Sequence, residues 1–246
     1  MFDPIVIYVV CIVFVATLIR SALGFGEALV AVPLLAICIP ITVAAPLAVL
    51  ISVLVAAVVL VQDWRRVELR SAAGLIFSSL PGIPAGVLLL TRGNEHIVKS
   101  ILGVSIVGFS FYALTTRTTR RLSDNHYGWL LGCGLLSGIL GGAYGMNGPP
   151  LAIYGALSGW SPQRFRATLQ GYFLPASLVG LICYAAAGLW SPVLTHYFLL
   201  SLPAIAVAVL LGGAINQRMS GHDFTRLIYF SLIAVGSVLL TQAITR

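Results

Sequence analysis

Seven stretches of the chain contain no Asp, Glu, Lys or Arg, and together they make up most of its length. They cover residues 4–19, 28–62, 71–91, 100–116, 125–163, 167–217 and 227–245. A helix needs about 20 mostly apolar residues to cross the hydrocarbon of a bilayer. Backbone groups in lipid must also be satisfied within the protein, which favours helices. The pattern therefore predicts an all-α polytopic membrane protein.

The lengths of these stretches predict irregular crossings. Stretch 167–217 is long enough for two crossings, with a natural break at 188–192, where Gly188 and Pro192 stand. Stretches 28–62 and 125–163 are each too long for one crossing and short for two. Each is expected to hold one full crossing and one half-length piece. We therefore expect about eight transmembrane helices, with a broken or re-entrant half-helix in each half of the chain.

Short matches recur in the same order in the two halves, which predicts an internal duplication. We expect one membrane domain built from two repeats, residues 1–122 and 123–246. The matches are Leu23-Gly24 and Pro33-Leu34 with Leu140-Gly141 and Pro150-Leu151, Ser79-Leu80-Pro81 with Ser201-Leu202-Pro203, and Lys99 with Arg226. Duplicated transporters place their substrate near the bilayer midplane, between discontinuous helices at matching positions of the repeats.

Composition supports a membrane protein over a soluble one. Hydrophobic residues make up 59% of the chain and charged residues only 9%, against about a quarter in soluble domains. The net charge of +7 is spread over loops between apolar stretches, as in loops that meet anionic lipid headgroups, so no nucleic-acid partner is expected. Stretch 4–19 lacks a basic leader and a cleavage site, so we expect it to be retained. The cysteines have packing roles, and neither a metal nor a cofactor is expected.

Two glycine- and proline-rich segments are the candidate functional breaks. Gly24 and Gly26 flank Phe25, and a half-helix that starts near Glu27 would present free N–H groups and a positive dipole end to an anion. In the second segment, 140–150, two consecutive prolines bar a regular helix before them. Close packing of small residues is the alternative explanation. It does not account for a Gly-x-x-Gly-Pro-Pro segment at membrane depth, so we favour functional breaks.

Arg20 and Glu27 are the charges most expected inside the hydrocarbon, where ionisable groups mark function by default. Three interpretations are open. Arg20 attracts an anionic substrate while Glu27 carries a coupling proton. The two residues neutralise each other in a structural role. In the third, Arg20 snorkels to the interface and Glu27 caps the half-helix.

A third polar segment, 161–168, follows the second break. Ser161 and Pro162 form a good helix start, while Arg164 and Arg166 either line a path by which anions reach the site or anchor the helix at the interface. Gln170, one turn later, is a polar residue that enters the next span. The predicted substrate-binding residues are Arg20, Gly24, Gly26, Glu27, Tyr144, Gly145, Asn147, Gly148 and Gln170.

These segments resemble the sulfite exporter TauE/SafE family of membrane anion transporters. The resemblance is carried by 24–35, beginning Gly-Phe-Gly-Glu, by 145–154 with its Gly-Pro-Pro, and by 161–168, which ends Arg-Phe-Arg-Ala-Thr. It implies transport of sulfite, sulfonates or related organic anions across the cell membrane, a bacterial inner membrane, coupled to protons or sodium. Glu27 and Arg20 depart from the residues common in the family, so the resemblance supports transport more firmly than it supports sulfite.

Other function classes are less consistent with the sequence. A membrane enzyme would need a nucleophile beside a base, and the apolar stretches contain no His-Glu-x-x-His and no carboxylate cluster. A passive anion channel would use the same broken helices without coupling. A membrane scaffold would tolerate exchanges at Gly24, Gly26, Glu27 and Asn147.

Overall fold

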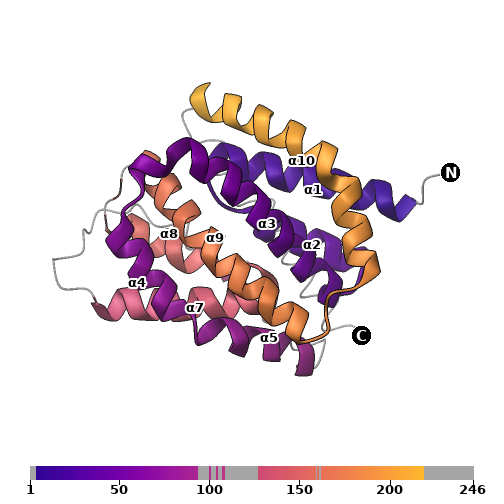
Figure 1. Ribbon diagram of the computed structural model, residues 1–246, viewed down its shortest axis with the longest axis horizontal. Coiled ribbons are helices and arrows are strands. Elements are labelled where there is room, and N and C mark those ends of the chain that lie inside the picture. Colours follow the sequence, from indigo (N-terminus) through magenta and orange to yellow (C-terminus); the bar gives the residue numbers. More distant parts are fainter. Residues whose placement is uncertain are drawn as a thin grey trace.

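The computed structural model describes residues 4–93, 100, 104, 107–108, 127–158, 160 and 162–218. Within these residues every regular element is helical (Figure 1), as the hydrophobic pattern predicts. The predicted crossing at 227–245 and most of that at 100–116 lie outside the described residues. Lys99, Ser161 and Arg226 lie outside them too.

In the first half, stretch 28–62 forms a half-length helix followed by a full-length one, as predicted. Helix α1 (Pro4–Leu23) is followed by the short α2 (Glu27–Cys38) and the long α3 (Ile41–Asp63). Pro40 separates α2 from α3, and Ile39 before it is extended, with φ −127° and ψ 154°. A residue that precedes proline is pushed out of the helical region, which explains why α2 ends there.

The second half has the same order of helices. Helix α7 (Tyr127–Tyr144) precedes the short α8 (Gly148–Leu157), so stretch 125–163 also holds a full-length and a half-length helix. Two long helices follow, α9 (Pro162–Ala186) and α10 (Pro192–Arg218). The predicted break at 188–192 and the predicted start at Pro162 are both confirmed.

Stretch 71–91 was counted as one crossing, and the structure shows that it is not one continuous helix. After the short 3₁₀ helix η1 (Trp64–Arg66) the chain forms α4 (Leu69–Ser79) and α5 (Gly82–Arg92), which are bent by 43° at the break between them. Pro81 lies at the bend, where a proline lacks the N–H donor and clashes with the preceding turn.

The predicted number of crossings is not confirmed. Among the described residues, α1, α3, α9 and α10 are long and apolar enough to cross a membrane, and the bent α4–α5 pair gives a fifth crossing if it counts as one. Stretches 100–116 and 227–245 cannot be counted, because they lie largely or wholly outside those residues. The two-repeat organisation stays a prediction.

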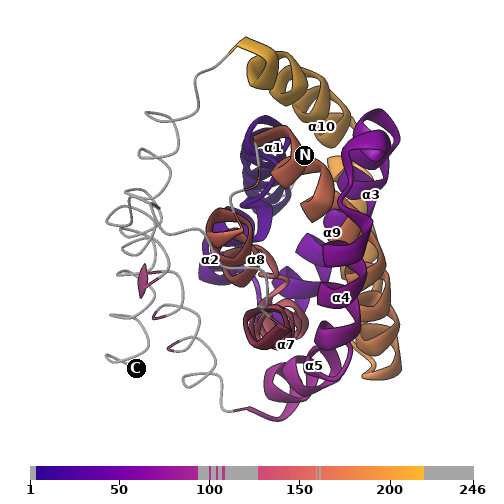
Figure 2. The ribbon, with the colours of Figure 1, turned by 90° about the vertical axis from the view of Figure 1, so that its left-hand side faces the viewer.

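The helices pack in a reciprocal way. Helix α1 lies along α10, α7 lies along α4 and α5, and α3 packs against α9. The first helix of each half therefore packs against the last described helices of the other half, as a duplicated chain would. The short helices α2 and α8 lie between α1 and α7 (Figures 1 and 2), so the beginnings of both half-helices are in the interior.

Candidate functional site

The first break brings Arg20 and Glu27 together. Helix α1 ends at Leu23, and Gly24 and Gly26 have φ of 87° and 100°, a region that residues with a Cβ rarely adopt. The chain turns there and α2 starts at Glu27, the position predicted. Arg20 thus stands in the last turn of α1 and Glu27 in the first turn of α2. These are the helix ends at which the dipole stabilises a cation and an anion, respectively.

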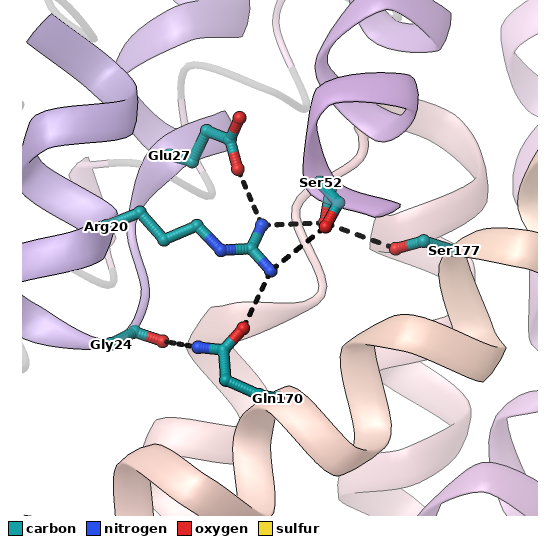
Figure 3. Close-up of polar contacts among 6 residues, drawn as sticks. All are labelled: Arg20, Gly24, Glu27, Ser52, Gln170 and Ser177. Carbon is teal, nitrogen blue, oxygen red and sulfur yellow. Dashed lines mark hydrogen bonds and ion pairs between the residues drawn. The ribbon is translucent and has the colours of Figure 1, made fainter. Parts of the chain in front are cut away.

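The two side chains form a buried ion pair. Arg20 Nη1 lies 2.6 Å from Glu27 Oε2, and the side chains are only 4% and 2% exposed (Figure 3). The interpretation in which Arg20 snorkels to the interface was therefore wrong. Glu27 does not cap α2 either, because the N-cap residue is Gly26 and no side-chain capping bond is present. The structure contains the pair of the interpretation in which the two residues neutralise each other, and the interpretation with an anionic substrate and a coupling proton stays a prediction.

Neutral groups hold the rest of the Arg20 guanidinium. Nη1 also donates to Ser52 Oγ at 2.7 Å, and Nη2 donates to Gln170 Oε1 at 2.9 Å. The Phe173 ring lies 4.9 Å from the guanidinium carbon, within cation–π distance. Glu27 is thus the one charged group bonded to Arg20 among the described residues.

Gln170 joins the break to the second half of the chain. Its Nε2 donates to the Gly24 carbonyl at 2.6 Å while its Oε1 accepts from Arg20 (Figure 3). The side chain is fully buried, so both ends of the amide are used within the protein. Helix α9 therefore fixes both the backbone of the first break and the direction of the guanidinium.

The second break is neutral. Gly145 has φ 68° and lies between the end of α7 at Tyr144 and the start of α8 at Gly148. The Ser137 hydroxyl donates to the Asn147 carbonyl at 2.7 Å, and the Tyr184 hydroxyl donates to the Gly142 carbonyl at 2.7 Å. The Tyr184 bond satisfies a carbonyl in the last turn of α7, where a helix leaves acceptors without intrahelical partners.

The two breaks face one another across a cavity. It has a volume of about 20 Å³, enough for roughly one water molecule. Of the predicted residues, six line it: Arg20, Gly26, Glu27, Gly145, Asn147 and Gly148. A Cβ added to Gly148 would lie 3.5 Å from Phe25 Cδ2, and one added to Gly145 would lie 3.7 Å from Ala28 Cβ. The beginnings of α2 and α8 are thus close neighbours.

Some atoms around the cavity have no hydrogen-bond partner among the described residues. Glu27 Oε1, Arg20 Nε and Asn147 Oδ1 are buried in this way. A buried polar group without a partner is costly, and its presence calls for an explanation such as a ligand or water. Arg20 and Glu27, two residues that line the cavity, thus have a donor and an acceptor unused, whereas Asn147 Oδ1 lies next to Gly141 of α7.

The other predicted residues lie around this cavity rather than on it. Gly24 and Gln170 belong to the Arg20 hydrogen-bond cluster, and Tyr144 is fully buried at the end of α7. Arg166 is half-buried, and its Cγ lies 2.9 Å from where a Cβ on Gly24 would be. Arg164 is exposed. Arg166 therefore lies against the first break.

Three residues of the cluster were not predicted from the sequence. Ser52 binds Arg20, Ser177 Oγ lies 3.3 Å from Ser52 Oγ, and Phe173 stacks on the guanidinium. Phe173 and Ser177 follow Gln170 by three and seven positions, so they share its face of α9. That spacing was a usable signal. Ser52 gave none, because it is a single hydroxyl within a long apolar stretch.

Comparison with known proteins supports one family. The sequence model of the sulfite exporter TauE/SafE family matches residues 9–239. A protein from Cupriavidus necator described as a probable sulfite/organosulfonate exporter TauE is 24% identical over 211 residues, which are 84% of this chain and 81% of that protein. No solved structure matches the chain.

Proposed function

The chain belongs to the sulfite exporter TauE/SafE family, and we propose that it is a secondary transporter that carries a small anion, such as sulfite or a sulfonate, across the cell membrane of a bacterium. It is a multi-pass membrane protein by its apolar helices, and the family is one of exporters rather than enzymes. The relative from Cupriavidus necator is described as acting on sulfite or organosulfonates, which favours these substrates.

One observation carries the proposed binding site: a buried arginine lies where two broken helices meet. Arg20, Glu27, Asn147 and Gly148 line a single cavity. Free N–H groups in the first turn of α2 and the positive end of its dipole favour an anion there. The same architecture, half-helices that meet near the midplane, is used by other secondary transporters for anionic groups. The substrate anion is proposed to bind between the breaks, opposite Arg20.

The small cavity implies that the breaks move during transport. A volume of about 20 Å³ admits one water and not a sulfonate group with its substituent. Opening would separate α2 from α8, while α3 and α9, which pack against each other, hold the two halves together. Protons or sodium ions are the proposed coupling ions, as for other carriers driven by a gradient.

Transport by reconstituted protein tests the proposal. Arg20→Ala is expected to raise the apparent Michaelis constant for a sulfonate at least about tenfold, since loss of a buried charge partner costs more than the 1.4 kcal/mol that a factor of ten represents. The Michaelis constant of Arg20→Lys should lie between those of the wild type and Arg20→Ala, because lysine keeps the charge but not the planar guanidinium. Arg65→Ala is the matched control, since Arg65 is exposed on η1 and lies over Trp64.

Three results would reject the proposal in different ways. Identical uptake curves for the wild type and Arg20→Ala would return Arg20 to a structural role. Failure to accumulate anion against its gradient would favour a passive channel. Unchanged transport after exchange of Gly24, Gly26, Glu27 or Asn147 would favour a scaffold.

A further inference from the structure

The charge balance of the buried cluster carries an inference that rests on the proposed function and defines its substrate more closely. Around Arg20, Glu27 is the one charged partner, while Ser52 and Gln170 are neutral acceptors. With Glu27 ionised the cluster has no net charge. With Glu27 protonated, the cluster carries one buried positive charge without a compensating negative charge. A low-dielectric interior strongly disfavours such a charge.

We propose that Glu27 acts as the resident anion of this site and that binding of one singly charged oxyanion is linked to uptake of one proton by Glu27. The exchange conserves charge: the substrate brings one negative charge, and the proton removes one from the carboxylate. The cluster is neutral before and after. Methanesulfonate-like and other monovalent oxyanions therefore fit, whereas a dianion such as sulfate leaves an excess negative charge.

Particular atoms of Glu27 and Arg20 are suited to accept the proton and to bind the anion. Glu27 Oε1 has no hydrogen-bond partner and belongs to a residue that lines the cavity, so it is the oxygen that accepts the proton. Glu27 Oε2 can still accept from Arg20 Nη1. Arg20 Nε–H, which has no acceptor among the described residues, is a donor available to the bound anion.

The neutral bonds keep Arg20 in place during this exchange. Gln170 Oε1 accepts from Nη2 at 2.9 Å, and Nε2 of the same amide donates to the Gly24 carbonyl, which anchors the side chain. Ser52 Oγ accepts from Nη1 at 2.7 Å and has Ser177 Oγ 3.3 Å away. Because these partners are neutral, they fix the direction of the guanidinium without cancelling its charge. The charge is thus left for whichever anion, Glu27 or substrate, is present.

Other titratable or charged groups near Glu27 do not provide this balance. Helix α3 faces it with the neutral Ser52, and Tyr8 of α1 donates to the Leu34 carbonyl, nearly two turns further along α2. Among the described residues, Arg20 is the group bonded to the Glu27 carboxylate. The other titratable or charged residues on α1, α2, α3, α7, α8 and α9, the elements around it, are Tyr8, Cys11, Arg20, Cys38, Asp63, Tyr127, Cys133, Tyr144, Tyr154, Arg164, Arg166, Tyr172, Cys183 and Tyr184.

Proton counting on the purified wild-type protein in detergent tests the linkage directly. Methanesulfonate is the probe, because its own charge does not change near neutral pH. Binding in weakly buffered solution with a pH indicator should take up one proton per anion at alkaline pH. The apparent dissociation constant should rise about tenfold for each pH unit in that range, and sulfate should bind at least about tenfold more weakly.

Variants assign the proton to a residue. Glu27→Gln keeps the shape of the side chain without a titratable group, so methanesulfonate should still bind, with no proton uptake and with a dissociation constant that does not vary with pH. Glu68→Gln is the matched control. It makes the same chemical change at the half-exposed residue that precedes α4, and it should behave like the wild type.

The outcomes separate this inference from the proposed function. Binding that requires Arg20 but takes up no proton, or that is equally strong for sulfate, overturns the linkage and leaves transport standing. An unchanged pH dependence in Glu27→Gln also overturns it. If the wild type binds neither methanesulfonate nor sulfite, both the inference and the proposed function fail. The wild-type proton count needs no variant, so a folding defect in Glu27→Gln does not remove the test.

Discussion

The two helix breaks meet at one cavity but are stabilised by different chemistry. At the first break, Arg20 and Glu27 form a buried ion pair, and Gln170 reaches across from α9 to bind both Arg20 and the Gly24 carbonyl. Its stability depends on charges that must remain balanced. At the second break, hydroxyl groups bind backbone carbonyls and no charged side chain takes part among the described residues.

The first turns of the two half-helices also differ in charge and in the number of N–H donors. Helix α2 starts with Glu27 and two further residues that have N–H donors. Helix α8 has Pro149 and Pro150 directly after Gly148, and a proline in the first turn removes a donor that has no intrahelical partner anyway. The first break is thus the side of the cavity that has charged groups and free N–H donors, and the second break is the neutral side. We interpret the first as the place where charge changes and the second as the part that shapes the site.

Breaking the charge balance should have the largest effect on stability. Glu27→Leu leaves Arg20 buried without its charged partner, which is expected to cost about 3–5 kcal/mol. At the second break, Asn147→Leu should cost about 1 kcal/mol or less, because Asn147 Oδ1 already has no partner and little hydrogen bonding is lost. Unfolding of both variants in the same detergent measures the difference. Equal losses would contradict the contrast between the breaks.

A double variant serves as the control for this prediction. Arg20→Met combined with Glu27→Leu removes both charges, and replacement of a buried pair by apolar residues of similar size is often neutral or stabilising. It should recover most of the lost stability and still fail to bind methanesulfonate. Recovery of stability without binding would separate the structural role of the pair from its role towards an anion.

The contrast between the breaks also shows how far the sequence could be read. The break positions, the start of α2 at Glu27 and the half-length of α2 and α8 follow from local rules on glycine, proline and apolar length. The bend at Pro81 was missed, although a proline within a stretch is a known signal. The crossing at 71–91 was judged from its length, and length carries no information on bends.

The site was predicted in part for a similar reason. Arg20, Glu27 and Gln170 stand out because polar groups are rare in apolar stretches, and the structure brings all three together. Ser52 became part of the cluster through the packing of α3 against α1 and α9, which no local pattern encodes. The pairing of Arg20 with Glu27 depended on how sharply the chain turns at Gly24 and Gly26, and the sequence left that open.

Alanine at the glycines of the breaks should have the next largest effect. Gly26 and Gly145 have φ of 100° and 68°, and a residue with a Cβ held in such a region costs about 1–3 kcal/mol. A Cβ on Gly26 would come no closer than 3.7 Å to Ile19, whereas one on Gly145 would lie 2.9 Å from Val49 Cγ2. Gly145→Ala should therefore destabilise more than Gly26→Ala in thermal unfolding.

The pH dependence of methanesulfonate binding should distinguish the same two variants in the reverse order, with the larger change in Gly26→Ala. Gly26→Ala acts directly before Glu27 and should change the pH dependence of methanesulfonate binding. Gly145→Ala should lower the amount of folded protein and leave that dependence as in the wild type. Gly213→Ala is a suitable control, since a Cβ there would meet nothing within 4 Å. The assignment of charge to the first break would be rejected if Gly145→Ala shifted the pH dependence and Gly26→Ala did not.

Loss of one hydroxyl at the second break should have the smallest effect. Tyr184→Phe removes the donor to the Gly142 carbonyl, 2.7 Å away, and to the Gly141 carbonyl at 3.3 Å. A neutral hydrogen bond contributes about 1 kcal/mol, so the unfolding midpoint should fall slightly. The proton count and the affinity for methanesulfonate should stay as in the wild type, because the hydroxyl carries no charge and its bonds go to the carbonyls of Gly141 and Gly142. Tyr197→Phe, at a half-buried position of α10, controls for the change of side chain. A loss of proton uptake in Tyr184→Phe would mean that the second break takes part in the charge exchange.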